Sequence, residues 1–130
     1  MNERRTEALG IINEMLSPEI AKALERGSQS TEFGSEIAEL AVDHAYADLW
    51  TRTGLDRKIR SIVTVSMMIA LRDSQELSIH IPAAVRNGVT IKELEEIIYH
   101  ATGYVGFPAA ASARNVAIKS LQEAGILQRK

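Results

Sequence analysis

The sequence predicts an all-α fold, on two observations. Apolar residues recur three or four positions apart through most of the chain, and the segments that carry them are separated by typical helix caps and stops. Alternating segments joined by a hairpin turn are missing from the sequence. At 130 residues the chain is most simply one domain. We therefore expect a single domain of about six to seven helices.

The N-terminal part predicts three helices. The first is expected over residues 3–16. Ser17 and Pro18 provide an N-cap and a first helical residue for the second helix, which should stop near Gly27. A polar connection follows, and a third helix is predicted over residues 35–50. Its residues at helical spacing are Ile37, Leu40, Ala41 and His44.

The centre of the chain predicts two helices with different surroundings. Asp56 is placed to cap a helix over residues 57–71. After Arg60 this segment is apolar on nearly all sides, so we expect a buried central helix. Ser74 should cap the next helix, which ends at the Asn87–Gly88 stop.

Two further helices complete the prediction. Thr90 and Glu93, three residues apart, predict a capping box at the start of the first. Phe107–Pro108 starts the last helix, and Gly125 closes it.

Composition excludes several classes of function. The chain has no cysteine, which rules out disulfides, thiolate metal sites and thiol redox chemistry. A net charge of −2 gives no electrostatic reason to expect nucleic acid or an anionic membrane as a partner. Without a signal-peptide core or a long apolar segment, the protein is expected in the cytoplasm.

The three histidines are the first candidates for chemistry. His80 is a polar ring among apolar residues, which fits either proton transfer or a core residue with satisfied nitrogens. His44 lies four residues before Asp48, a spacing that allows either an oriented imidazole or a simple intrahelical ion pair. Together with His100, these residues lack close metal-ligand spacing, so we predict no metal.

Cationic residues could bind an anionic substrate. Arg60 enters the predicted buried helix, where an unpaired charge would be costly, so Asp48 or Glu76 is expected as its partner. Tyr104 is either a pocket hydroxyl or a buried aromatic residue. The other cations considered are Arg52, Arg57, Lys58 and Arg86.

Two segments resemble the carboxymuconolactone decarboxylase family, which is grouped with the alkylhydroperoxidase D-like proteins. They are LWTRTGLDRKIRSIVTVSMMIAL and ELSIHIPAAVRNGVTIKELEEIIYHATGYVGFPAA. The resemblance covers residues 35–121, which gives a core domain preceded by an N-terminal helical extension over residues 1–30. It implies a helical alkylhydroperoxidase D-like fold that assembles as a homo-oligomer, a trimer or a hexamer.

The resemblance implies two chemistries, and the missing cysteines decide between them. The hydroperoxidase branch carries a Cys-x-x-Cys pair before its histidine, and those positions fall on Asp73 and Glu76 here. Neither side chain can act as a redox thiol. Ser61 likewise stands where that branch often has a catalytic glutamate. The decarboxylase branch lacks the cysteine pair and keeps the histidine, as this sequence does.

The implied reaction converts 4-carboxymuconolactone into 3-oxoadipate enol-lactone and CO₂. The lactone itself accepts the electrons that CO₂ leaves behind, so no cofactor is needed in principle. His80 is the expected proton donor, with an ordinary pKa of about 6.5. The resemblance makes His80, Glu76 and His44 the candidate catalytic residues. The candidate substrate-binding residues are Arg60, Arg86, Tyr104, Trp50 and Asp48.

Two departures from the family pattern keep other functions open. Pro82 replaces a residue that is commonly basic in the family, and it interrupts helical hydrogen bonding two residues after His80. His44 replaces an apolar or aromatic residue. Action on a different small acid or lactone is therefore one alternative, and a non-catalytic helical oligomer that binds a ligand is another.

Overall fold

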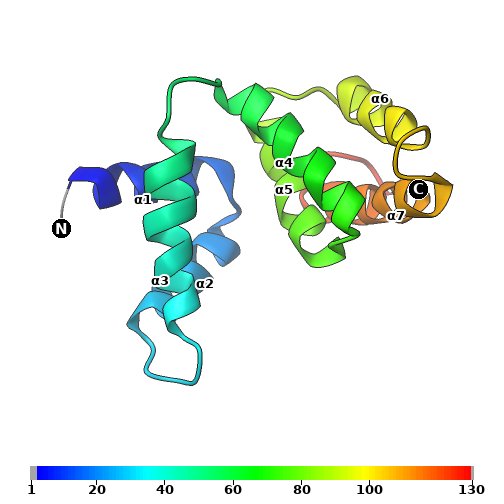
Figure 1. Ribbon diagram of the computed structural model, residues 1–130. Helices are drawn as coiled ribbons and strands as arrows, with labels where there is room; N and C mark the ends of the chain where they lie inside the picture. Colours follow the sequence, from blue (N-terminus) through cyan, green and yellow to red (C-terminus); the bar gives the residue numbers. More distant parts are fainter. Residues whose placement is uncertain (1–2, 130) are drawn as a thin grey trace. The chain divides into compact units, whose positions relative to one another are not determined.

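The computed structural model describes residues 3–129, and all regular structure within them is helical, as predicted (Figure 1). The chain divides into two compact units, the first ending at Asp56 and the second beginning at Arg57. Within residues 3–129, none of the helices has the length and apolar character needed to cross a membrane. The first unit holds α1 (Glu3–Met15), α2 (Pro18–Gln29), α3 (Glu36–Leu40) and the π-helix η1 (Ala41–Trp50). The second holds α4 (Arg57–Leu71), α5 (Ser74–Arg86), α6 (Ile91–Ala101) and α7 (Phe107–Glu123).

The first unit is built mainly on the packing of α1 against η1. Ile12 and Met15 of α1 are fully buried, as is Val42 of η1. The rings of Tyr46 and Trp50 stack with their centroids 6.4 Å apart. Burial of these apolar side chains supplies the stability of the unit.

The helix predicted over residues 35–50 is an α-helix only from Glu36 to Leu40. From Ala41 to Trp50 the backbone follows a π-helix, which is wider than an α-helix and turns its side chains out of the 3.6-residue register. Ile37 and Leu40, which precede the π-helix, are 75% and 63% exposed, so their helical spacing does not mark a buried face.

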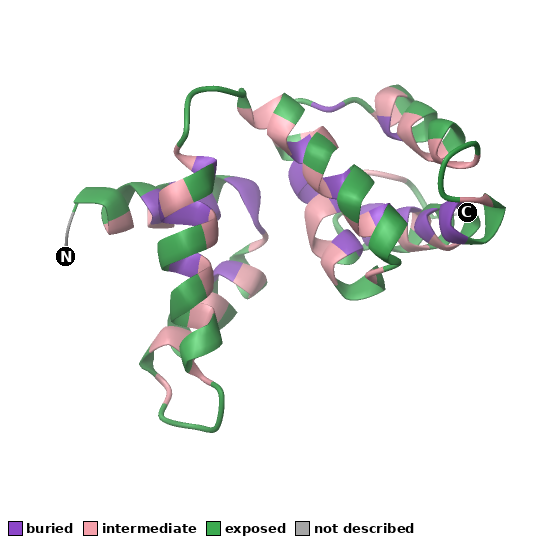
Figure 2. Ribbon diagram, in the orientation of Figure 1, coloured by how far each residue is buried: buried purple, intermediate pink, exposed green. Residues whose placement is uncertain are grey.

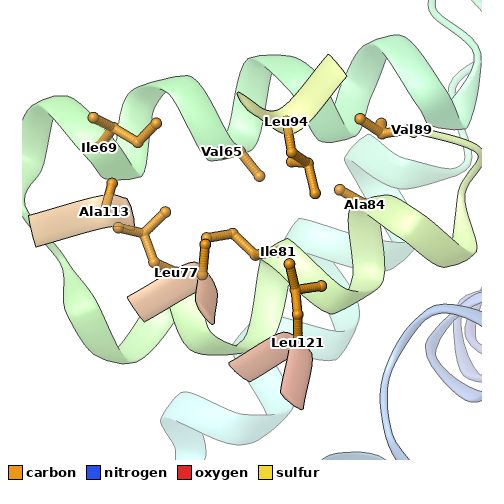
Figure 3. Close-up of a cluster of buried hydrophobic side chains, with 10 residues drawn as sticks. Val65, Ile69, Leu77, Ile81, Ala84, Val89, Leu94, Ala113 and Leu121 are labelled. Carbon is orange, nitrogen blue, oxygen red and sulfur yellow. The ribbon is translucent and has the colours of Figure 1, made fainter. Parts of the chain in front are cut away.

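The second unit contains a continuous apolar core. Leu77 and Ile81 of α5 point toward Val65 and Ile69 of α4, and side chains of α7 close the cluster (Figure 3). The buried residues of this cluster are Val65, Ile69, Leu77, Ile81, Ala84, Val89, Leu94, Ala113, Ala117 and Leu121. The core fixes α5, the helix that carries His80, between α4 and α7.

The prediction that α4 is buried on nearly all sides is wrong. One face packs into the core, whereas the opposite face is exposed along the helix (Figure 2). An α-helix within one layer of neighbours buries a single stripe, even when its other side is also apolar. The exposed apolar residues of α4 are Ile59, Val63, Met67 and Leu71.

The helix caps fix the starts of α5 and α6. Asp73, and not the predicted Ser74, caps α5 by accepting a hydrogen bond from the backbone N–H of Glu76 at 3.1 Å. The predicted capping box of α6 is confirmed, because Thr90 and Glu93 each accept a hydrogen bond from the backbone N–H of the other.

Candidate functional site

Helix α5 places Glu76 and His80 on the same face, one turn apart. The Asp73 cap orders the first turn at Glu76, and Leu77 anchors the helix in the core beside it. The carboxylate Oε2 of Glu76 lies 3.4 Å from Nε2 of His80. This distance is longer than a well-formed N–H···O hydrogen bond, so the pair is in loose contact.

The two side chains of this pair differ in their exposure to solvent. The imidazole of His80 is only 12% exposed, whereas the carboxylate of Glu76 is 44% exposed. Burial lowers the pKa of His80 from its ordinary value of 6.5, and the attraction and hydrogen bonding of Glu76 raise it by less. The imidazole of the free protein is therefore mostly uncharged near neutral pH.

An anionic substrate would change this balance. A carboxylate brought against the imidazole favours the imidazolium form, because opposite charges at short range stabilise each other. His80 can then take up a proton as the substrate binds and act as a general acid.

Pro82 does not break the helix beside His80. Helix α5 continues from Ser74 to Arg86 with Pro82 inside it and buried. Because proline lacks an N–H, the helical hydrogen bond to the carbonyl of Ser78 is missing at this turn. The packed core around Ile81 holds the helix in register.

A polar contact that the sequence did not reveal joins α4 to the end of α5. Nδ2 of Asn87 donates a hydrogen bond of 2.9 Å to Oγ of Ser61, which is 2% exposed. In the sequence, Asn87 indicates only a helix stop, and Ser61 only a departure from the hydroperoxidase branch. Their pairing depends on tertiary packing across 26 positions of sequence.

The predicted pair of His44 and Asp48 forms in the first unit. Nδ1 of His44 lies 3.0 Å from Asp48 Oδ2, and the other carboxylate oxygen accepts a hydrogen bond from Arg4. The imidazole of His44 is 71% exposed. Such an exposed ring lacks the dry surroundings that strengthen electrostatic catalysis. The arrangement fits the surface ion-pair interpretation better than the catalytic one.

The remaining candidates occupy three different settings. Trp50 is buried in the first unit against Tyr46. Arg60 lies partly buried in the first turn of α4, and Arg86 lies exposed in the last turn of α5. The expectation that Asp48 or Glu76 pairs with Arg60 stays a prediction. Asp48 contacts Arg4 and His44, and Glu76 contacts His80.

Tyr104 is a surface residue, and not the buried aromatic that the sequence also allowed. It is 81% exposed, and its ring stacks on that of His100 with centroids 4.9 Å apart. Both line a cleft of about 550 Å³ between α4 and α6 whose walls are mainly apolar. Among its other lining residues are Ile62, Ser66, Ile69, Glu96 and Ile97.

Metal-binding side chains do not gather in the part of the chain that the structure describes. Over residues 3–129, no three His, Asp or Glu side chains come close enough together to hold an ion. Within residues 3–129, two histidines lie in contact with a carboxylate, His80 with Glu76 on α5 and the exposed His44 with Asp48.

Comparison with known proteins identifies the family. The sequence model of the carboxymuconolactone decarboxylase family matches residues 35–119, well over half of the chain. The chain belongs to the carboxymuconolactone decarboxylase family. The resemblance inferred from the sequence is thereby confirmed, and the matched segment includes both His44 and His80.

Two relatives of this chain have names that describe their reactions. The 4-carboxymuconolactone decarboxylase of Acinetobacter baylyi is 34% identical over 128 residues, which cover 98% of this chain and 89% of the relative. The nitrosuccinic acid decarboxylase of Metarhizium robertsii is 36% identical over 94 residues, which cover 72% of this chain and 66% of the relative. Both are decarboxylases, which confirms the predicted carboxy-lyase at the level of reaction class.

Proposed function

We propose that this member of the family decarboxylates 4-carboxymuconolactone to 3-oxoadipate enol-lactone, with His80 as the proton donor. The buried imidazole of His80, in contact with the carboxylate of Glu76, is the observation that carries the proposal. Similarity to the Acinetobacter baylyi enzyme along nearly the whole chain supports this substrate.

The proposed reaction requires mainly a positioned proton donor from the protein. Breaking the bond to the carboxylate releases CO₂ and leaves an electron pair delocalised into the unsaturated lactone. A ring carbon then takes a proton, which we assign to His80. Positioned proton transfer of this kind contributes about 10² to 10⁴ in rate. Because the lactone serves as the electron sink, the reaction needs no organic cofactor or metal.

Positive charge in the site favours binding of an anionic substrate. Arg60 and Arg86 lie on the two helices that flank the Ser61–Asn87 hydrogen bond, and we propose them as carboxylate-binding residues. Tyr104, Trp50 and Asp48 stay proposed contacts of the substrate, as the sequence suggested. Because Trp50 is buried in the first unit, we assign it only apolar contact with a substrate.

A nitro-substituted acid is the second candidate substrate, favoured by similarity to the Metarhizium robertsii enzyme. Loss of a carboxylate next to a nitro group also leaves an electron pair that a neighbouring acceptor delocalises. The same histidine could protonate either carbanion. The replacement of the usual basic residue by Pro82 fits a substrate with a different arrangement of charges.

We also propose that the protein assembles as a homo-oligomer, either a trimer or a hexamer. The exposed apolar face of α4 and the exposed aromatic rings of Tyr104 and Phe107 support assembly. Light scattering coupled to size-exclusion chromatography measures the mass directly. A monomer at all protein concentrations would contradict this part of the proposal.

The experiment that tests the function compares the two substrates with purified protein. Release of CO₂ and ultraviolet loss of substrate are followed for 4-carboxymuconolactone and for nitrosuccinate at equal concentrations. The proposal predicts the larger kcat/KM for the lactone. A larger value for nitrosuccinate would transfer the assignment to the second candidate, and no turnover of either would refute both.

A further inference from the structure

We propose that Glu76 is a proton-relay residue, which returns a proton from solvent to Nε2 of His80 after each turnover. This role rests on the proposed decarboxylation. It also assigns to Glu76 a function that orientation of the imidazole alone would not require.

The stoichiometry of the reaction creates the need for a relay. When a carboxylate leaves as CO₂, the bond between it and the ring carbon is replaced by a bond to hydrogen. Each turnover therefore consumes one proton. If His80 supplies that proton from Nε2, the imidazolium becomes a neutral imidazole, and Nε2 must be reprotonated before the next turnover.

The structure places one ionisable group between this nitrogen and water. The His80 ring is 12% exposed, which limits its direct protonation by water. The carboxylate of Glu76 lies 3.4 Å from Nε2 and is itself 44% exposed. It is also the charged group that acts electrostatically on the imidazole. A proton can bind Glu76 at its exposed side and pass to Nε2.

The loose contact between Glu76 and His80 suits proton relay better than rigid orientation of the imidazole. At 3.4 Å the Nε2 proton is not held in a short hydrogen bond to the carboxylate. Small rotations of either side chain can bring Nε2 toward the substrate carbon or back toward Glu76. Both groups lie on one rigid helix, which keeps them within one turn of each other throughout the cycle.

Glu76→Gln is the variant that tests the relay, because glutamine keeps the size and hydrogen bonding of the side chain and cannot carry the proton. With protein in excess, pre-equilibrated below the pKa of His80, the first turnover should proceed at nearly the wild-type rate. Steady-state turnover should fall by about tenfold or more, since the donor is reloaded slowly. Added imidazole buffer should restore the steady-state rate of the variant by reprotonating His80 directly.

Glu95→Gln is the matched control, because Glu95 is an exposed glutamate on another helix, α6, and accepts a hydrogen bond from the hydroxyl of Tyr99. It should leave both rates and their buffer dependence unchanged. An equal loss of first-turnover and steady-state rates in Glu76→Gln, without rescue by imidazole, would overturn the relay and leave Glu76 an orienting residue. Unchanged kinetics in Glu76→Gln would overturn it as well.

A measurement without substrate separates failure of the relay from failure of the proposed function. Nuclear magnetic resonance of protein with ¹⁵N-labelled histidine gives the rate at which the His80 ring proton exchanges with water. Exchange should be several-fold slower in Glu76→Gln, whereas that of the exposed His100 should not change. The same His80 exchange rate in both proteins would overturn the relay, even if the wild type turned over neither substrate.

Discussion

Nε2 of His80 lies 3.4 Å from the carboxylate of Glu76, one turn earlier on helix α5. The imidazole is buried and the carboxylate is half-exposed. One helix therefore carries a candidate proton donor and, in contact with it, an ionisable group that reaches solvent. The contact follows from the spacing of four residues, which brings side chains together on the same face of any α-helix. Its chemical character follows from the core that buries one of the two groups.

The stability of the protein should fall as the solution is acidified through the window below pH 6.5. The unfolded chain protonates this imidazole near the ordinary pKa of 6.5, whereas burial lowers the pKa of His80 in the folded protein. Between those two pKa values the unfolded state binds more protons, so the free energy of unfolding decreases as pH decreases. Urea unfolding at a series of pH values measures this slope.

His80→Gln provides the comparison for that slope, because it removes the titrating group and keeps a polar side chain. The variant should lose less stability than the wild type over the same pH window. Equal slopes for the two proteins would show that His80 does not carry the effect.

Removing the cap of α5 should destabilise the helix that carries His80. Asp73→Ala leaves the backbone N–H of Glu76 without its acceptor and should cost about 1 kcal/mol in the free energy of unfolding. Ser74→Ala, at the position that the sequence first suggested, should change that free energy by less than about 0.5 kcal/mol. Chemical denaturation measures both variants, and a larger cost for Ser74→Ala would contradict the assigned cap.

The hydrogen bond between Asn87 and Ser61 should appear as a coupling between two helices. A double-mutant cycle with Ser61→Ala and Asn87→Ala should give an interaction energy of about 0.5 to 1.5 kcal/mol. Ser66→Ala, at an exposed serine of the same helix, is the matched control and should combine additively with Asn87→Ala. Additivity of the Ser61 and Asn87 changes would mean that the bond contributes nothing to stability.

Local features of the fold were predictable from the sequence because their causes are local. The capping box of Thr90 and Glu93 needs only two residue types three positions apart, and it forms as predicted. The contact of His44 with Asp48 needs only a spacing of four, and the structure contains it. The cap of α5 was misplaced by one residue, because Asp73 and Ser74 are both good capping residues and the sequence does not rank them.

Features that depend on packing were not predictable in the same way. The π-helix from Ala41 to Trp50 resembles an ordinary helix in its composition, since apolar spacing does not distinguish hydrogen bonding over four residues from bonding over five. The apolar composition of α4 predicted burial, although packing covers only one of its faces. The partnership of Ser61 with Asn87 arises only when α4 and α5 are side by side.

The candidate site also combines features that the sequence predicts with features that depend on packing. The sequence singled out His80, and resemblance to the family gave it a reaction. The apolar residues around His80 in the sequence left burial open as one interpretation, and the packing of the surrounding helices provides the burial that lowers its pKa. Tyr104 was left open between pocket hydroxyl and buried aromatic, and only the structure shows its ring exposed against His100.

Decarboxylation of 4-carboxymuconolactone by the wild type and by His80→Ala, measured as CO₂ release under identical conditions, tests the central claim most directly. Urea unfolding of both proteins confirms that the variant is folded. Wild-type turnover together with a loss of about 10² or more in kcat for the variant is the predicted result. Equal turnover by a folded His80→Ala would contradict the account, because the proton would then come from a group other than His80.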